Sequence, residues 1–322
     1  MSLSKLGRRW ILPAICAGIA GANLPSIAQE PATAKATPGQ KAAIYDEKAD
    51  AKQLIAKAVM KANRDNSRVL VMFGGNWCGW CHKLHGTLKS DAKLAKTMLD
   101  EYQLVMVDTA APNAKEVMAD YKVDPRAGVP YLVVLDGNGK VLCNQETSSL
   151  EEGDHHDPAK VLAFLEKNRA EPADAKKAYE AALSQAASQD KLVFLHFGAP
   201  WCGWCHHLEN FLARDDMAAI FDRQFVDRKI DVDRMTGGKE MAEKFKADRK
   251  GIPWFAFLDR DGKVVADSDG PDGQNIGYPA EPKEIDHFIA MLKKAATKLT
   301  PEQIAKIEAE LKSAGDKIRN RN

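Results

Sequence analysis

A chain of 322 residues, 45% of them hydrophobic, can bury a large core and is long enough for two domains. Its formal net charge is only +1, from 46 basic and 45 acidic residues. Nucleic acids and anionic membranes bind strongly basic surfaces, so this balance argues against both as partners.

Residues 1–28 have the pattern of a signal peptide that is cleaved after Ala28. Three basic residues precede an apolar run from Trp10 to Leu24, which is too short and too interrupted by proline to span a bilayer. Arg8-Arg9 leaves a twin-arginine signal open beside the general secretory route. We expect a periplasmic or secreted protein that is not inserted in a membrane after signal removal. Its formal charge then falls from +1 to −2.

After a flexible Ala-, Pro- and Thr-rich leader at 29–44, the chain is an internal duplication. Residues 45–170 and 171–298 match with an offset of 123 or 124 residues, which pairs Cys78 with Cys202. Two repeats of this size indicate two domains rather than a solenoid.

Each repeat predicts the same order of elements. An amphipathic helix leads into an apolar strand, and a Cys-x-x-Cys pair then opens a second helix. A short helix, a strand, another helix, a strand led by proline, a tight hairpin and a last helix follow. This order predicts an α/β fold with a mixed sheet flanked by helices. In the two repeats the first helix is expected at 47–65 and 172–189, the strand before the cysteines at 69–73 and 192–197, and the proline-led strand at 131–135 and 254–258.

Residues 299–322 have no counterpart in the first repeat and predict a C-terminal helix. Thr300-Pro-Glu-Gln303 is a helix-start signature, and Ile304, Ile307 and Leu311 begin an apolar stripe. The helix either docks on its own second domain or makes a dimer contact with another subunit.

The cysteine pairs carry the predicted chemistry. Two cysteines three residues apart in the first turn of a helix share one face and can close a reducible disulfide. Unpaired N–H groups and the helix dipole favour a thiolate at the first position, so Cys78 and Cys202 are the predicted nucleophiles. Cys81 and Cys205 are the predicted resolving thiols. No organic cofactor is needed, because the cysteines carry the electrons.

Cys-x-x-Cys-His is also the spacing that attaches a c-type haem, and each pair with its following His82 or His206 offers three metal ligands. Haem requires an axial ligand, normally in a helical domain, whereas the surroundings here are rich in strands. A zinc site lacks a fourth ligand nearby in the sequence. The redox interpretation is therefore preferred, no metal site is predicted, and the two histidines are interpreted as helix-surface residues that tune the thiolate.

The order of strand, Trp-Cys-x-x-Cys, helix and proline-led strand resembles the thioredoxin superfamily over nearly all of both repeats. The motif Phe-Gly-x-x-Trp-Cys-Gly-Trp-Cys-His-x-Leu is most similar to bacterial exported thioredoxin-like (thiol:disulfide interchange) proteins. The resemblance implies that Val129-Pro130 and Ile252-Pro253 face the dithiols in loops that bind an extended substrate chain. It also implies that Trp77 and Trp201 shape the substrate groove.

One departure separates the repeats. Members of this superfamily usually have a buried Asp six residues before the first cysteine, where it relays protons. Met72 stands there in the first repeat and His196 in the second. His196 is either a proton relay or a buried, hydrogen-bonded structural histidine. The first domain must use water or another group, or turn over slowly.

We therefore expect an exported thiol–disulfide oxidoreductase that acts on protein thiols and disulfides and has an upstream redox partner. The alternative is a non-catalytic thioredoxin-fold protein that holds a client protein or copper. Reductases, oxidases and isomerases share this machinery. Cys143, aligned with Ala266, is interpreted as strand packing or as a regulatory or intermolecular thiol. The segment 154–157, Asp-His-His-Asp, is interpreted as a solvated helix start rather than a metal site.

Overall fold

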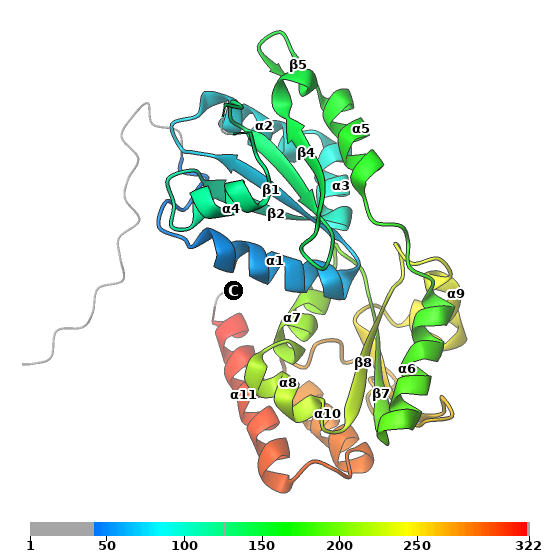
Figure 1. Ribbon diagram of the computed structural model, residues 1–322. Helices are drawn as coiled ribbons and strands as arrows, with labels where there is room; N and C mark the ends of the chain where they lie inside the picture. The colour runs from blue at the N-terminus through cyan, green and yellow to red at the C-terminus, as the bar shows by residue number, and fades with distance from the viewer. Residues whose placement is uncertain (1–41, 125, 321–322) are drawn as a thin grey trace, which may run out of the picture. The chain divides into compact units, whose positions relative to one another are not determined.

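The computed structural model describes residues 42–124 and 126–320. The predicted signal peptide and most of the predicted leader lie outside these ranges. Within these ranges, two α/β domains follow one another along the sequence (Figure 1). In the described ranges, no helix has the length and apolar character that a membrane crossing requires.

The first domain contains a four-stranded sheet in the order β2-β1-β3-β4. Strand β1 is parallel to β2 and antiparallel to β3, and β3 is antiparallel to β4, so the sheet is mixed as predicted. The elements are α1 (Ala51–Asp65), β1 (Arg68–Gly74), α2 (Gly79–Ser90), α3 (Ala92–Glu101), β2 (Tyr102–Asp108), α4 (Ala114–Asp120), β3 (Tyr131–Leu135), β4 (Val141–Glu146) and α5 (Pro158–Asn168).

The second domain repeats this arrangement, with its sheet in the order β10-β9-β7-β8. Strand β7 is parallel to β8 and antiparallel to β9, as β1 is to its neighbours. The elements are α6 (Ala175–Gln189), β7 (Leu192–Gly198), α7 (Gly203–Leu212), α8 (Asp215–Phe221), β8 (Phe225–Asp231), α9 (Gly238–Lys244), β9 (Trp254–Leu258), β10 (Val264–Asp267) and α10 (Pro282–Ala295).

The duplication extends to the helix caps. Asp50 caps α1 by accepting a hydrogen bond from the N–H of Gln53, and Asn66 ends the helix in the left-handed conformation. In the second repeat Asp174 caps α6 and Asp190 ends it in the same conformation. The ends of α1 and α6 are therefore set by capping residues in the sequence next to each helix.

Each sheet is covered on both faces, so its central strands are buried without alternation. Successive side chains still point to opposite faces. In β1, Leu70 and Met72 join the apolar cluster that contains both cysteines of the first motif, whereas Val71 and Phe73 join the cluster on the other face. Met72 therefore lies on the cysteine side of the sheet.

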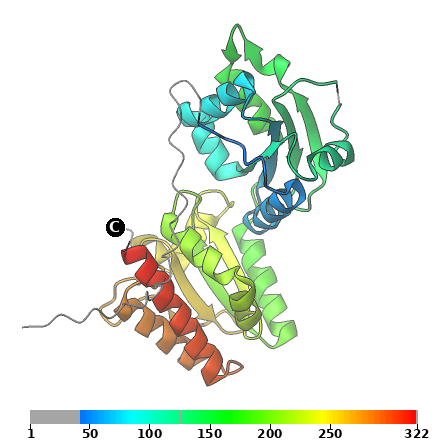
Figure 2. The ribbon, with the colours of Figure 1, turned by 90° about the vertical axis from the view of Figure 1, so that its left-hand side faces the viewer.

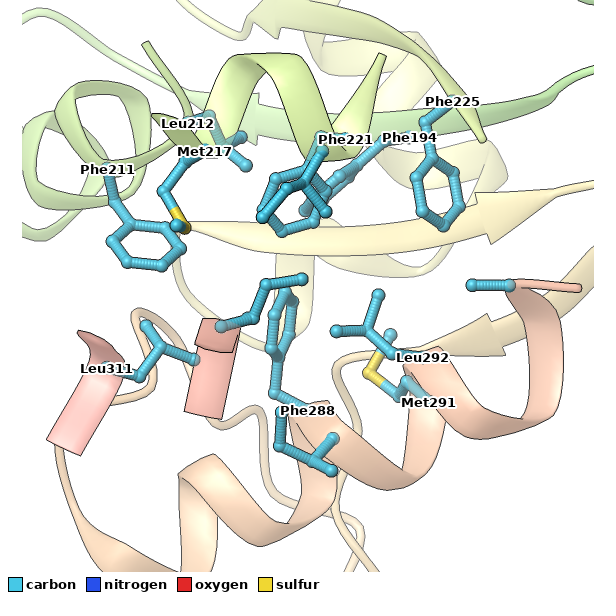
Figure 3. Packing of buried hydrophobic residues seen from close by; sticks show 14 of the residues in the cluster. Phe194, Phe211, Leu212, Met217, Phe221, Phe225, Phe288, Met291, Leu292 and Leu311 are labelled. Carbon is cyan, nitrogen blue, oxygen red and sulfur yellow. The ribbon is translucent and has the colours of Figure 1, made fainter. Parts of the chain in front are cut away.

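The C-terminal helix α11 (Pro301–Arg319) packs on its own second domain. It runs alongside α10 in both views of the ribbon (Figure 1, Figure 2). Its stripe residues Ile307 and Leu311 are fully buried in one apolar cluster. Figure 3 shows Leu311 in this cluster with Phe221 and Phe288. A contact of this helix with a second subunit stays a prediction.

One segment differs from the expectation. Asp157 does cap α5, accepting from the N–H of Ala159, but the residues before it do not form a solvated helix start. His155–His156 form strand β6, which pairs with β5 (Glu151–Glu152). His156 has no exposed surface, because its ring packs edge-on against Trp80 at a centroid distance of 5.4 Å. The interpretation of 154–157 as solvated is wrong at His156.

Candidate active site

In each domain a buried strand leads directly into a cysteine pair at a helix N-terminus. Cys78 is the N-cap of α2, and its sulfur accepts a hydrogen bond from the N–H of Cys81 at 3.0 Å. Cys202 caps α7 in the same way, at 3.1 Å. Both pairs are joined as disulfides, with Cα atoms 5.2 Å apart. The first sulfur of each pair thus lies where a helix favours negative charge.

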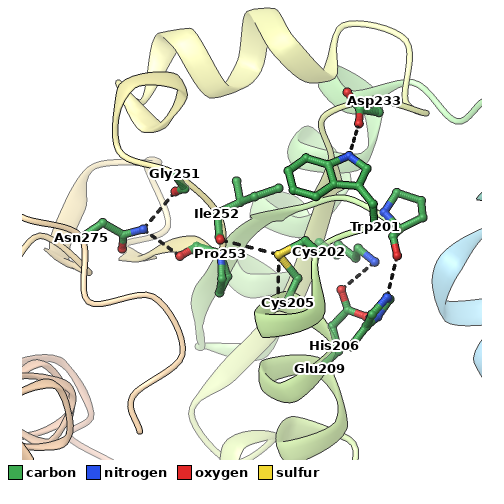
Figure 4. The surroundings of a disulfide bond; sticks show 12 residues. Trp201, Cys202, Cys205, His206, Glu209, Asp233, Gly251, Ile252, Pro253 and Asn275 are labelled. Atoms are coloured by element: carbon green, nitrogen blue, oxygen red, sulfur yellow. Dashed lines mark hydrogen bonds and ion pairs between the residues drawn. A yellow bond between two sulfur atoms is a disulfide. The ribbon is translucent and has the colours of Figure 1, made fainter. Parts of the chain in front are cut away.

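The proline loops lie opposite the first cysteine of each pair. The carbonyl oxygen of Val129 is 3.5 Å from Sγ of Cys78, and that of Ile252 is 3.6 Å from Sγ of Cys202 (Figure 4). The peptide bonds to Pro130 and Pro253 are both cis. Each loop therefore presents backbone groups beside the sulfur that is the predicted nucleophile.

Tryptophans form exposed apolar surface beside both disulfides. Trp77 is 74% exposed and Trp201 is 60% exposed. The indole of Trp201 donates a 2.7 Å hydrogen bond to Asp233, which fixes its orientation (Figure 4). Trp204, between the two cysteines of the second motif, stacks on Tyr278. Exposed aromatic surface next to a reactive sulfur is typical of a surface that contacts another protein.

The histidine after each pair turns its ring back to the motif's first residue. Nε2 of His82 is 2.9 Å from the carbonyl oxygen of Asn76, and Nε2 of His206 is 2.7 Å from that of Pro200. His206 has a second partner, the Glu209 carboxylate at 3.4 Å. Hydrogen bonding to Glu209 raises the pKa of His206. In the described ranges, no cluster of three or more His, Cys, Asp or Glu is arranged to hold a metal ion.

A buried ion pair lies behind the second disulfide. Glu209 is 3% exposed, and its carboxylate is 2.6 Å from Nζ of Lys229. Although burial raises the pKa of Glu209, hydrogen bonding to His206 and the charge of Lys229 outweigh it and lower this pKa to about 2. A Cβ added at Gly198 would lie 3.4 Å from Sγ of Cys205 and 3.6 Å from Cε of Lys229, so the stem of the lysine and the second cysteine of the pair border the same small space.

His196 belongs to the same side of the second sheet. It is 3% exposed, its neighbour in the parallel register is Lys229, and Nε2 lies 3.1 Å from the Asp227 carboxylate. In the first domain the corresponding register pair is Met72 and Met106. The role of His196 as a proton relay stays a prediction.

The sequence reasoning missed Glu209 and Lys229. The available signal was a carboxylate in the midst of apolar helix positions, four residues after Cys205, since Leu208, Phe211 and Leu212 around it are all buried. Its ion-pair partner is on a different element and gives no local signal.

Comparison with known proteins agrees with the fold and the motifs. A model described as "Thioredoxin-like domain" matches residues 55–148, and one described as "Thioredoxin-like" matches residues 174–260. Thioredoxin-1 of Drosophila melanogaster is 35% identical over 90 residues, which cover 28% of this chain and 77% of that protein. The chain belongs to the thioredoxin superfamily, and it contains two domains of that fold.

Longer relatives match both domains together. Protein disulfide-isomerase erp38 of Neurospora crassa is 27% identical over 207 residues, which cover 62% of this chain and 53% of that protein. The chain thus spans about half the length of this relative. Among solved structures, a disulphide isomerase from Xylella fastidiosa Temecula1 is 26% identical, with 38% of this chain and 95% of that chain covered and a TM-score of 0.34.

Proposed function

We propose that this protein is an exported thiol–disulfide oxidoreductase that exchanges disulfides with protein substrates at two Cys-Gly-Trp-Cys sites. One observation carries the proposal. In both domains the first sulfur caps a helix, faces the carbonyl of a proline loop and is bonded to a second cysteine that is more deeply buried. A helix N-terminus stabilises the thiolate that forms when such a disulfide opens.

The chemistry needs only the cysteines. In the reduced protein the Cys78 thiolate attacks a substrate disulfide, forming a mixed disulfide while one substrate sulfur leaves with the electron pair and takes a proton from solvent. The Cys81 thiolate then attacks Sγ of Cys78. The Cys78–Cys81 bond forms, and the second substrate sulfur leaves in the same way. The substrate has gained two electrons, and the reverse sequence oxidises it. Cys202 and Cys205 act equivalently.

The surface around the nucleophiles suits an extended protein chain. The exposed rings of Trp77 and Trp201 offer apolar contact, and the backbone of the Val129-Pro130 and Ile252-Pro253 loops offers hydrogen bonds. Protein thiols and disulfides are therefore the proposed substrates, and an upstream redox partner restores the starting state. The pattern of residues 1–28 supports a periplasmic or secreted location, where disulfides persist.

An insulin-reduction assay with Cys78→Ala, Cys202→Ala and the double variant tests the proposal. Each single variant is expected to retain exchange at the other site, and the double variant to have none, because each site then lacks its nucleophile. Full activity in the double variant would contradict the enzymatic role. Stoichiometric copper binding by the wild type without turnover would instead support the non-catalytic alternative. The reduction potentials of the two sites then assign the direction of electron flow.

A further inference from the structure

A tyrosine lies behind the resolving cysteine of the first domain. Tyr45 precedes α1, is 4% exposed and belongs to the apolar cluster that contains Cys78, Cys81 and Met72. Within the described part of the chain, its hydroxyl has no hydrogen-bond partner while the disulfide is closed. A buried hydroxyl without a partner is unusual in a folded protein and points to a state in which it has one.

The hydroxyl of Tyr45 and the sulfur of Cys81 border the same small space. Gly74, at the end of β1, separates the two groups. A Cβ added at Gly74 would overlap both the Tyr45 hydroxyl and Sγ of Cys81, the latter at 2.5 Å. Both atoms lie within 3.0 Å of the position that a Cβ of residue 74 would occupy. Only a glycine at residue 74 therefore leaves the space between the hydroxyl and the sulfur open.

The first residue of the motif holds Tyr45 in place. Oδ1 of Asn76 accepts hydrogen bonds from the backbone N–H groups of Ile44 and Tyr45, both at 2.9 Å, and Nδ2 donates to the carbonyl of Tyr45 at 3.0 Å. The second motif begins with Pro200, which has no side-chain amide, and the space at Gly198 is bordered by Lys229 instead. The Asn76–Tyr45 arrangement is therefore a property of the first domain.

The surroundings of Tyr45 favour the protonated, neutral form of its hydroxyl. Burial raises the pKa of its hydroxyl, and the nearby Asp108 carboxylate raises it further. Other titratable side chains on elements packed near Cys81 include His82, Lys83, His85 and Lys89 on α2 and His156 on β6, whereas β1 and β2 place Met72 and Met106 on this side of the sheet. A disulfide sulfur accepts hydrogen bonds weakly, but a thiolate accepts them strongly.

We propose that the Tyr45 hydroxyl donates a hydrogen bond to the Cys81 sulfur once the disulfide opens, and so stabilises the thiolate that resolves mixed disulfides in the first domain. This inference rests on the proposed function, because it concerns a step of disulfide exchange. The Cys81 thiol loses its proton to solvent and the thiolate attacks Sγ of Cys78. The Cys78–Cys81 bond forms, and the substrate sulfur leaves with the electron pair of the mixed disulfide and takes up a proton. Asn76 acts as a positioning residue for Tyr45.

The pKa of Cys81 tests the inference without any substrate. In the full chain, every cysteine except Cys81 is replaced by serine, and its titration is followed by the carbon-13 shift of the labelled cysteine Cβ. Tyr45→Phe is expected to reduce the thiolate fraction at neutral pH about tenfold, since a hydrogen bond to a charged group is lost. Asn76→Ala keeps the hydroxyl but frees its backbone, so a smaller reduction is expected.

Tyr102→Phe is the matched control. Tyr102 is buried in the same domain, and its hydroxyl donates to the carbonyl of Leu165 at 2.5 Å, so its loss should leave the titration of Cys81 unchanged. An unchanged Cys81 pKa in both Tyr45→Phe and Asn76→Ala would overturn the inference. That outcome is separate from failure of the proposed function, which the insulin assay on the double cysteine variant reports.

Discussion

The two dithiol sites share the motif Trp-Cys-Gly-Trp-Cys-His and differ in the residues that lie behind it. Behind Cys81 are Met72, Met106 and the neutral hydroxyl of Tyr45. Behind Cys205 is a lysine that forms a buried ion pair with Glu209. Electrostatic interactions are strong where water is excluded, so two sites with the same motif can have different resolving steps. In the proposed function, the duplicated motif carries out the disulfide exchange, and the residues behind it differ between the two sites.

The largest effect on stability is expected from replacing Lys229 with methionine, the residue that the first domain has at the corresponding position, Met106. Lys229→Met leaves the Glu209 carboxylate buried without its ammonium partner, which costs about 3 to 5 kcal/mol. Hydrogen exchange of the backbone amides should be faster in β7 of the variant than in β7 of the wild type. The amides of β1, in the unsubstituted first domain, serve as the internal reference. Lys239→Met removes an exposed lysine 3.9 Å from Asp233 and should cost less than about 1 kcal/mol. Equal losses of stability from the two substitutions would show that the buried ion pair contributes no more than an exposed one.

Acid should destabilise the second domain through Glu209. The folded pKa of Glu209 is about 2, below its ordinary value of 4.5. A depressed carboxylate pKa stabilises the fold above pH 4.5, and this stability is lost as pH falls toward 2. We expect a loss of about 2.4 kcal/mol that is absent in Glu209→Gln, measured by urea unfolding at pH 5 and pH 2.5. The same acid sensitivity in Glu209→Gln would assign it to other carboxylates.

The same substitution should change exchange chemistry at the second site alone. Glu209→Gln removes the carboxylate 2.6 Å from Nζ of Lys229, so the ammonium is expected to favour a thiolate at Cys205 more strongly. With Cys78→Ala silencing the first site, the pH profile of insulin reduction should move down by about one unit, or about 1.4 kcal/mol. With Cys202→Ala silencing the second site, the profile should be unaffected. A shift at both sites would mean that Glu209 does not act locally.

The smallest effect is expected at Cys143. This thiol lies on β4, is partly buried and is not disulfide-bonded. Its counterpart in the second repeat is Ala266, so Cys143→Ala should change the free energy of unfolding by less than about 1 kcal/mol and leave exchange activity intact. Urea unfolding and the insulin assay measure both. A marked loss of activity would instead support a regulatory or intermolecular thiol.

Local patterns were sufficient for most of the architecture. The predicted order of elements is confirmed, because apolar periodicity, capping residues and the dipeptides of tight hairpins act over a few neighbouring residues. The hairpin β5–β6 was missed, since each of its strands has only two residues. Burial of His156 depends on its packing against Trp80, which is 76 residues away in the sequence.

The sequence by itself determined that two thioredoxin-like domains follow one another and that each opens a helix with a cysteine pair. The duplication is visible as a constant offset of 123 or 124 residues, and the cysteine pair depends on spacing within one helix turn. Only the tertiary structure decided what lies behind the second cysteine of each pair. Lys229 and Glu209 come from a strand and a helix, and Tyr45 comes from the segment just after the predicted leader. Their positions follow from the packing of separate elements, which sets the local dielectric and hydrogen bonding of each thiol and cannot be deduced from sequence neighbours.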